Sequence, residues 1–406
     1  IMPELIGGNK LVMDYRSPSR GEIYDRNGEP VVAHTDAVAL GVIPGQINQE
    51  TAWQLHNQLS NVTELTPEGV AALYENAGAD WYVSVGETTA DEAQRLLSAN
   101  LGGLYITPYS ARYYFNGGVA PQTIGYLLSI SPEELEDYLR RGYGGDEKIG
   151  DAGLEKWGEE YLTGTHGGSL YVVNPEGAII TRLAQSDPGP SSSLHLTIDR
   201  ELQVHAQNAL RGFRGAAVVL ERDTGRVLAM VSSPGFDPNL FEPTNANNDG
   251  LTALLSNTDQ PLVNRATQGQ YPLGSVFKVI TFSAALSSGL YTADTTYACG
   301  YDFVELPDRT LHDWTWEHCQ TEIQTSFATD PENALTLNTC PTKPSGDLTL
   351  SESLMRSCNP YYWHIGLDLY SSERTQDIAN MARAFGLGQA TGLGQVAESE
   401  GLIEDP

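Results

Sequence analysis

The chain has 406 residues, 40% of them hydrophobic, which is too long for one ordinary core and predicts two or three domains. Its 52 acidic residues outnumber 23 basic ones, and the resulting net charge of −29 argues against a nucleic acid partner. No run reaches the roughly 18 apolar residues of a membrane span, and the start has no signal-peptide pattern. We therefore expect a protein that is soluble or has lost its anchor, and a start at Ile1 favours the second.

The first half of the chain has the pattern of a mixed α+β region. Residues 20–28 predict a short strand that runs into an Asn-Gly turn. Apolar residues recur at helical spacing in 51–59, 66–76 and 89–99, and each run begins with a threonine suited to an N-cap. The Pro-, Gly- and Ser-rich residues 187–193 then predict a linker between domains.

After this linker the pattern changes. Residues 194–198 alternate as in a strand, residues 200–210 have helical periodicity, and residues 216–220 and 227–231 predict a β-hairpin. A long helix is expected from Ser275 to about Ser288, where Gly289 ends it. Together these elements predict an α/β sheet covered by helices.

The four cysteines, Cys299, Cys319, Cys340 and Cys358, all lie in the second half. They form no C-x-x-C pair, and His312 and His318 do not complete a zinc-ligand spacing, so no metal is expected. One or two disulfides in an irregular insertion are the preferred interpretation, and free buried thiols are the alternative. Disulfides would indicate an oxidising, extracytoplasmic setting.

Ser275 and Lys278 are the candidate nucleophile and base. Pro272 and Gly274 stop the preceding segment, so a helix begins near the serine, where unpaired N–H groups favour developing negative charge. Residues three apart share a helical face, so the lysine amine can reach the serine hydroxyl while Val276 and Phe277 point towards the core. The chain has lysines only at positions 10, 148, 156, 278 and 343, and this scarcity argues against a merely solubilising role for Lys278. The pattern S-x-x-K alone is nevertheless frequent by chance.

The second element is Ser357-Cys358-Asn359. An S-x-N turn can place a hydroxyl beside the lysine, where it relays a proton to a leaving amine, and an amide beside the substrate. Taken alone, Ser357 is better explained as a helix cap.

Both elements belong to a series of six stretches that follow one another in a fixed order. They are RGEIYDRNG (20–28), IGDAGLEK (149–156), LTIDRELQ (196–203), TGRVLAMVS (224–232), YPLGSVFK (271–278) and SCN (357–359). Through these stretches the chain resembles the class B penicillin-binding proteins over almost its whole length, and this order and context make both elements specific. Within that family, residues 116–117, 123–126 and 130–135 resemble elongation-type and methicillin-resistance-type members.

The resemblance implies three regions: residues 1–19 as a linker from a preceding region, 20–190 as an α+β pedestal, and 193–406 as an α/β transpeptidase domain of the penicillin-binding and serine β-lactamase type. It also implies a peptidoglycan D,D-transpeptidase at the extracytoplasmic face of the cytoplasmic membrane, working without a cofactor. Ser275 would be the nucleophile, Lys278 its base, Ser357 a proton relay and Asn359 a substrate contact. The implied partners are stem peptides, β-lactams, a membrane-embedded glycan polymerase and other cell-wall synthesis proteins.

The family's third motif, Lys-Thr/Ser-Gly on a strand, is not found. Lys343-Pro344-Ser345-Gly346 precedes the S-x-N element, and its proline removes a strand N–H. We therefore expect a fragment of a longer chain, without the anchor and the C-terminal strands, that is inactive by itself. A non-catalytic wall scaffold or sensor, and a D,D-carboxypeptidase or β-lactamase, are the alternative functions.

Overall fold

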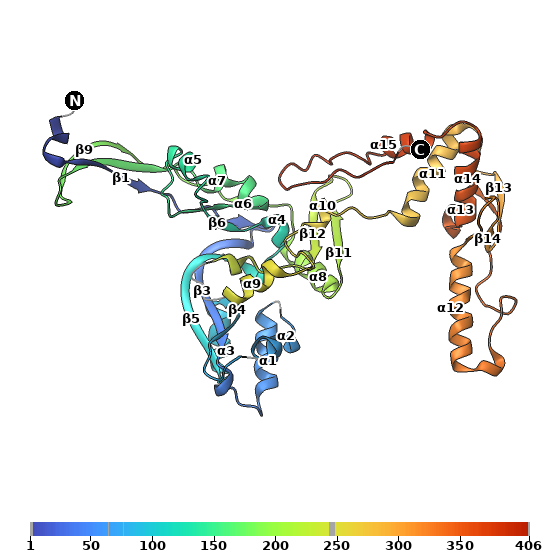
Figure 1. Ribbon diagram of the computed structural model, residues 1–406, viewed down its shortest axis with the longest axis horizontal. Coiled ribbons are helices and arrows are strands. Elements are labelled where there is room, and N and C mark those ends of the chain that lie inside the picture. Colours follow the sequence, from blue (N-terminus) through green and yellow to red (C-terminus); the bar gives the residue numbers. More distant parts are fainter. Residues whose placement is uncertain (1–2, 64, 76, 243–247, 405–406) are drawn as a thin grey trace. The chain divides into compact units, whose positions relative to one another are not determined.

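The computed structural model describes residues 3–63, 65–75, 77–242 and 248–404. The chain divides into two compact units, one of residues 1–269 with 393–398 and the other of residues 270–392 with 399–406. Figure 1 labels their helices and strands in chain order.

The main sheet of the first unit has the strand order β10-β2-β3-β4, with β5 also paired to β3. Strands β3 and β5 are antiparallel from Val32 opposite Tyr114 to Val42 opposite Leu104, and Figure 1 shows them as long, curved neighbours. The strands of this sheet are β2 (Ile23–Tyr24), β3 (Pro30–Val42), β4 (Val83–Thr89), β5 (Leu104–Tyr114) and β10 (Leu194–His195).

The three helices predicted in the first half are confirmed as α1 (Ala52–Val62), α2 (Pro67–Tyr74) and α3 (Ala90–Ser98). The Thr66 and Thr89 side chains cap α2 and α3, whereas the predicted cap at Thr51 makes no such bond. Their apolar faces cover one side of the sheet and bury a core that includes Leu40, Val42, Leu55, Leu59, Val70 and Leu96.

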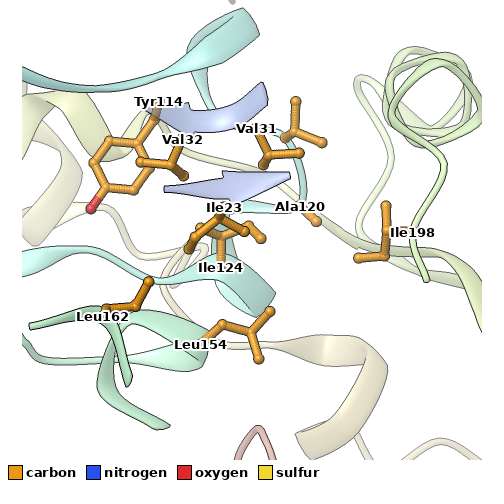
Figure 2. Packing of buried hydrophobic residues seen from close by; sticks show 10 residues of the cluster. Ile23, Val31, Val32, Tyr114, Ala120, Ile124, Leu154, Leu162 and Ile198 are labelled. Atoms are coloured by element: carbon orange, nitrogen blue, oxygen red, sulfur yellow. The ribbon is translucent and has the colours of Figure 1, made fainter. Parts of the chain in front are cut away.

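A second core in this unit joins segments that are far apart in the sequence. Figure 2 shows Ile23 and Val32 of the sheet packed with Ile124, Leu162 and Ile198. Residues 194–195 also pair in parallel with β2. The chain after the Pro- and Gly-rich segment therefore stays bound to the pedestal sheet. The two compact units divide after Gly269, and the domain boundary at 190–193 stays a prediction.

A buried ion cluster lies beside this core. The fully buried carboxylate of Glu155 accepts hydrogen bonds from Arg20 Nε (2.9 Å) and from Arg112 Nε (2.7 Å). Burial by itself would raise the pKa of Glu155, but the charges of Arg112 and Arg20 and their hydrogen bonds hold it below its usual value. The cluster ties together two of the family-like stretches, those at 20–28 and 149–156.

The remaining elements of the first unit form a three-stranded sheet, a short hairpin and small helices. Part of the segment expected as a linker, Lys10–Arg16, is β1, which pairs with β8. These elements are β1, β8 (Gly167–Val173) and β9 (Ile179–Ser186); β6 (Leu127–Ser129) and β7 (Lys148–Gly150); and α4 (Pro121–Ile124), α5 (Leu135–Arg140), α6 (Gly153–Trp157), α7 (Glu159–Leu162), α9 (Asn248–Ser256) and α10 (Arg265–Gln268).

The helix and hairpin predicted after the linker are confirmed. They are α8 (Arg200–Leu210), β11 (Gly215–Leu220) and β12 (Val227–Ser233), and in the described part of the chain the two strands pair only with each other. The buried Gln203 of α8 hydrogen-bonds both backbone groups of Met230, at 2.7 and 2.9 Å, which fixes the helix on the hairpin.

The second unit is mainly helical. Its core contains Ala285, Leu350, Tyr361, Ile365 and Leu369, contributed by three helices. Its elements are α11 (Lys278–Ser288), α12 (Trp314–Thr329), α13 (Leu350–Arg356), α14 (Asn359–Ser371) and α15 (Asp377–Ala384), with the paired strands β13 (Thr296–Cys299) and β16 (Gly346–Thr349), and β14 (Asp302–Phe303) and β15 (Leu311–His312).

Candidate active site

Ser275 and Lys278 lie at the beginning of the predicted long helix. Gly274 adopts a φ of 57°, which glycine tolerates best, and residues 274–277 form a 3-10 turn that leads into α11. The Ser275 side chain is exposed, whereas Lys278 is only 8% exposed. The expectation that Val276 points towards the core is wrong, since Val276 is 68% exposed. The tighter turn aims it outward, and the helix buries Ile280, Ala284 and Ala285 instead.

Lys278 is held by residues of the S-x-N element. Its Nζ atom donates to the Ser357 carbonyl oxygen (2.6 Å), to Ser357 Oγ (3.0 Å) and to Asn359 Oδ1 (2.5 Å). Ser357 Oγ in turn donates to Ser275 Oγ at 3.1 Å. The structure therefore brings all four predicted side chains together, and it joins the serine to the lysine through Ser357.

The environment of Lys278 suits a general base. Burial lowers the pKa of its amine, and the negative charge of Asp313 partly opposes this effect. The ring of Tyr362 lies 5.4 Å from Nζ, and the hydrogen-bond acceptors around the amine are uncharged oxygens. A lysine with a lowered pKa has a larger fraction of neutral amine at a given pH. Only the neutral amine can accept the proton of a hydroxyl through a hydrogen-bonded relay.

Ser357 occupies a strained position between two helices. It ends α13 with φ 53° and ψ 36°, a left-handed conformation that is unusual for a residue with a side chain. Strain of this kind costs about 1–3 kcal/mol and persists where the surroundings enforce it. The backbone of Ser357 ends α13, so the interpretation as a helix cap applies to the backbone. The hydroxyl of Ser357 lies between Ser275 and Lys278 and hydrogen-bonds both.

Two disulfides, the larger of the two numbers expected, stabilise this region. Cys319 pairs with Cys340 inside the insertion, and Cys299 of β13 pairs with Cys358, the middle residue of S-x-N. The Cys299–Cys358 bond joins strand β13 to the start of α14, so it restrains the two residues that contact Lys278.

Asp313 is a functional candidate that the sequence analysis missed. It is fully buried; Oδ1 accepts a hydrogen bond from the Asn359 backbone N–H (2.9 Å), and Oδ2 accepts from Thr315 N (3.2 Å) and Thr315 Oγ1 (2.6 Å). An aspartate just before a helical run is a recognisable N-cap signal. Its hydrogen bond to the Asn359 backbone cannot be predicted from the local sequence, because Asn359 lies 46 residues away.

Asp313 also lies near the Cys299–Cys358 bond. The potential ligand atoms of these three residues are within 4.8 Å of one another, the one such group in the described part of the chain. Because both sulfur atoms are joined in a disulfide, they offer no thiolate to a metal. The arrangement therefore acts as a structural support for the S-x-N turn.

Two family models match the chain in order. The penicillin-binding protein dimerisation domain matches residues 15–196, and the penicillin binding protein transpeptidase domain matches residues 215–337. The peptidoglycan D,D-transpeptidase MrdA of Escherichia coli K12 is 30% identical over 405 residues, which cover 97% of this chain and 59% of that protein. The chain thus spans about three fifths of the length of this curated relative.

Solved structures show the same fold. A complex between penicillin-binding protein PBP2 and MreC from Helicobacter pylori matches with a TM-score of 0.64 and 22% identity, covering 98% of this chain and 69% of that one. A peptidoglycan synthase complex that coordinates polymerization and crosslinking matches with a TM-score of 0.60 and 28% identity, covering 98% and 64%. Of the two subgroups that the sequence suggested, the comparisons support the elongation type. The chain belongs to the penicillin-binding proteins, as a class B, elongation-type member.

Proposed function

We propose that this chain carries the nucleophile and base of a peptidoglycan D,D-transpeptidase, which forms cell-wall cross-links through an acyl-enzyme on Ser275. The observation that carries the proposal is the chain of contacts from Ser275 through Ser357 to the buried amine of Lys278. A serine, a hydroxyl relay and a lysine with a lowered pKa are the groups that an acyl transfer needs.

In the first half-reaction, the proton of Ser275 moves through Ser357 to Lys278 as the serine oxygen attacks the carbonyl carbon of the penultimate D-Ala. The Ser275 backbone N–H contributes to an oxyanion hole for the tetrahedral intermediate. The C–N bond then breaks, the leaving D-Ala amine takes a proton from Ser357, and the acyl group stays on Ser275. Asn359 hydrogen-bonds the acyl side of the substrate.

In the second half-reaction, the amine of another stem peptide attacks the acyl-enzyme carbonyl. Its proton passes through Ser357 and Lys278, the C–O bond to Ser275 breaks, and the serine recovers its proton. The overall change exchanges one amide bond for another, which requires no cofactor. β-Lactams, whose strained amide mimics the donor peptide, should acylate the same serine.

The cell envelope is the proposed location, at the extracytoplasmic face of the cytoplasmic membrane. The family membership and the two disulfides support this location. None of the helices in the described residues is long and apolar enough to span a membrane. The proposed partners are a membrane-embedded glycan polymerase and other cell-wall synthesis proteins. One of the similar solved structures is a complex with MreC, and the other is a peptidoglycan synthase complex.

Labelling with a fluorescent penicillin tests the proposal in the full-length protein. We expect label on the wild type, none on Ser275→Ala, and unchanged label on Ser287→Ala, which removes an exposed hydroxyl from the same helix. Absence of Ser275-dependent labelling would favour a non-catalytic scaffold or sensor instead. Where labelling occurs, analysis of the products separates a transpeptidase, which joins two stems, from a carboxypeptidase or β-lactamase, which transfers the acyl group to water.

A further inference from the structure

A cavity of about 510 Å³ lies in the second unit, and one of its lining residues, Arg356, directly precedes Ser357 in the chain. The beginning of α12, the loop of residues 341–345 and the last turn of α13 form its walls. Trp314 and Met355 contribute apolar surface to it, and Lys343 and Arg356 contribute positive charge.

The two cations of this cavity are not neutralised by carboxylates. Within the part of the chain that the structure describes, neither Lys343 nor Arg356 forms an ion pair. Lys343 Nζ donates to the Asn338 carbonyl oxygen (2.7 Å), and Arg356 Nε approaches Ser345 Oγ (3.5 Å). The sign of these two charges is opposite to the net charge of the chain, which is −29.

One acidic residue, Glu352, also lines the cavity, but its carboxylate has other partners. It accepts hydrogen bonds from the Thr349 N–H and the Thr349 hydroxyl, both at 2.9 Å, and so completes the capping box of α13. Glu352 keeps its negative charge, so the lining carries two positive charges against one negative charge, and an incoming anion meets a site with a net positive charge.

Covalent and hydrogen-bonded links connect the cavity wall to the catalytic relay. Trp314 follows Asp313, whose carboxylate holds the Asn359 N–H. The Trp314 Nε1 atom donates to the carbonyl oxygen of Arg356 at 3.3 Å, and Arg356 directly precedes Ser357. The wall of the cavity is therefore connected to Ser357, the residue to which an attacking amine must deliver its proton, through the backbone of Arg356.

We propose that this cavity binds a carboxylate of the acceptor peptide, the one whose amine attacks the acyl-enzyme. This inference rests on the proposed function and adds a substrate subsite to it. Arg356 and Lys343 hold the carboxylate, while Trp314 and Met355 contact the aliphatic part of the peptide. The amine of the bound peptide is then directed towards Ser357, so its nitrogen attacks the carbonyl carbon on Ser275 as the C–O bond breaks.

Two matched acceptor peptides test the subsite in the full-length protein. One is N-acetyl-alanyl-γ-glutamyl-lysine, with two carboxylates and a free ε-amine, and the other carries carboxamides at both positions. Titration calorimetry should show that the wild type binds the diacid about tenfold more tightly, as charge-assisted hydrogen bonds would produce. The double variant Lys343→Gln, Arg356→Gln should lose this preference. Arg309→Gln, which removes an exposed cation elsewhere in the unit, should keep it.

Equal affinity of the wild type for the two peptides, including no measurable binding of either, would overturn the subsite. Retention of the preference in the double variant would overturn it as well, provided that the thermal unfolding midpoint shows the variant to be folded. Penicillin labelling of the same wild-type preparation separates the two proposals. Label on Ser275 without a diacid preference rejects the subsite alone, whereas absence of label rejects the proposed function.

Discussion

The Nζ atom of Lys278 contacts Ser357 twice, at the backbone oxygen (2.6 Å) and at Oγ (3.0 Å). The same hydroxyl lies 3.1 Å from Ser275 Oγ, so hydrogen bonds connect the nucleophile to the base through Ser357. Ser357→Ala should slow acylation by penicillin about a hundredfold or more, because the relay is lost. Stopped-flow labelling measures the rate, and Ser351→Ala, an exposed serine of α13, is the matched control. A rate within twofold of the wild type would exclude a relay through Ser357.

The lowered pKa of Lys278 predicts a pH dependence. Acylation should rise with pH as the amine loses its proton, and its midpoint should lie below the ordinary lysine value of 10.5. The unfolded chain holds this proton more tightly, so the stability contribution of the group also increases as pH rises through that interval. A pH–rate profile checks the midpoint. Lys278→Arg keeps the cation but cannot release its proton, so a similar pH-dependent rise in this variant would contradict the assignment.

Asp313→Asn tests two effects of the buried carboxylate, one on the pKa of Lys278 and one on the free energy of unfolding. The charge of Asp313 raises the pKa of Lys278, so its removal should shift the acylation midpoint to lower pH. The free energy of unfolding should also fall by about 1–3 kcal/mol, because one of the two accepting oxygens is replaced. Denaturant titration and the pH–rate profile measure the two effects. Asp347→Asn, on the exposed side of β16, should produce neither, and an unshifted midpoint would limit Asp313 to a structural role.

Glu155→Ala tests the buried ion cluster of the first unit. Removal of the carboxylate leaves Arg20 and Arg112 without their shared partner and should cost about 3–5 kcal/mol of unfolding free energy. Since the folded pKa of Glu155 lies below its usual 4.5, its contribution is present above pH 4.5 and disappears as pH falls through the folded value. Urea titrations at several pH values measure this. Glu160→Ala, an exposed neighbour, should change little, and an equal loss in both variants would contradict the account.

The two disulfides should differ in their effect on the site. Replacing Cys299 and Cys358 by serine should cost about 2–4 kcal/mol and slow acylation, because this bond restrains the S-x-N turn. The paired change at Cys319 and Cys340 lies within the insertion and should leave the acylation rate near that of the wild type. Thermal unfolding and penicillin labelling of both double variants measure the contrast. Equal acylation rates in the two would show that the Cys358 bond does not position the site.

Local patterns predicted several elements of this chain. The threonines before α2 and α3, the periodicity of residues 200–210 and the hairpin at 216–231 carry their signals within a few residues, and all are present in the structure. The outward orientation of Val276 was not predictable from α-helical spacing, because residues 274–277 form a 3-10 turn, in which side chains have a different angular spacing. The link between residues 194–195 and β2 is equally non-local, since its partner lies about 170 residues earlier.

The sequence by itself determined the chemistry available at the site: Ser275 and Lys278 three residues apart at a helix start, and Ser357 and Asn359 in a second turn. Only the tertiary structure decided how these groups connect. Burial of Lys278 among oxygen acceptors, the pairing of Cys299 with Cys358, and the reach of Asp313 to Asn359 all join segments that are distant in the chain. Such contacts arise when the core of α11, α13 and α14 closes, and desolvation of the lysine is a consequence of that closure.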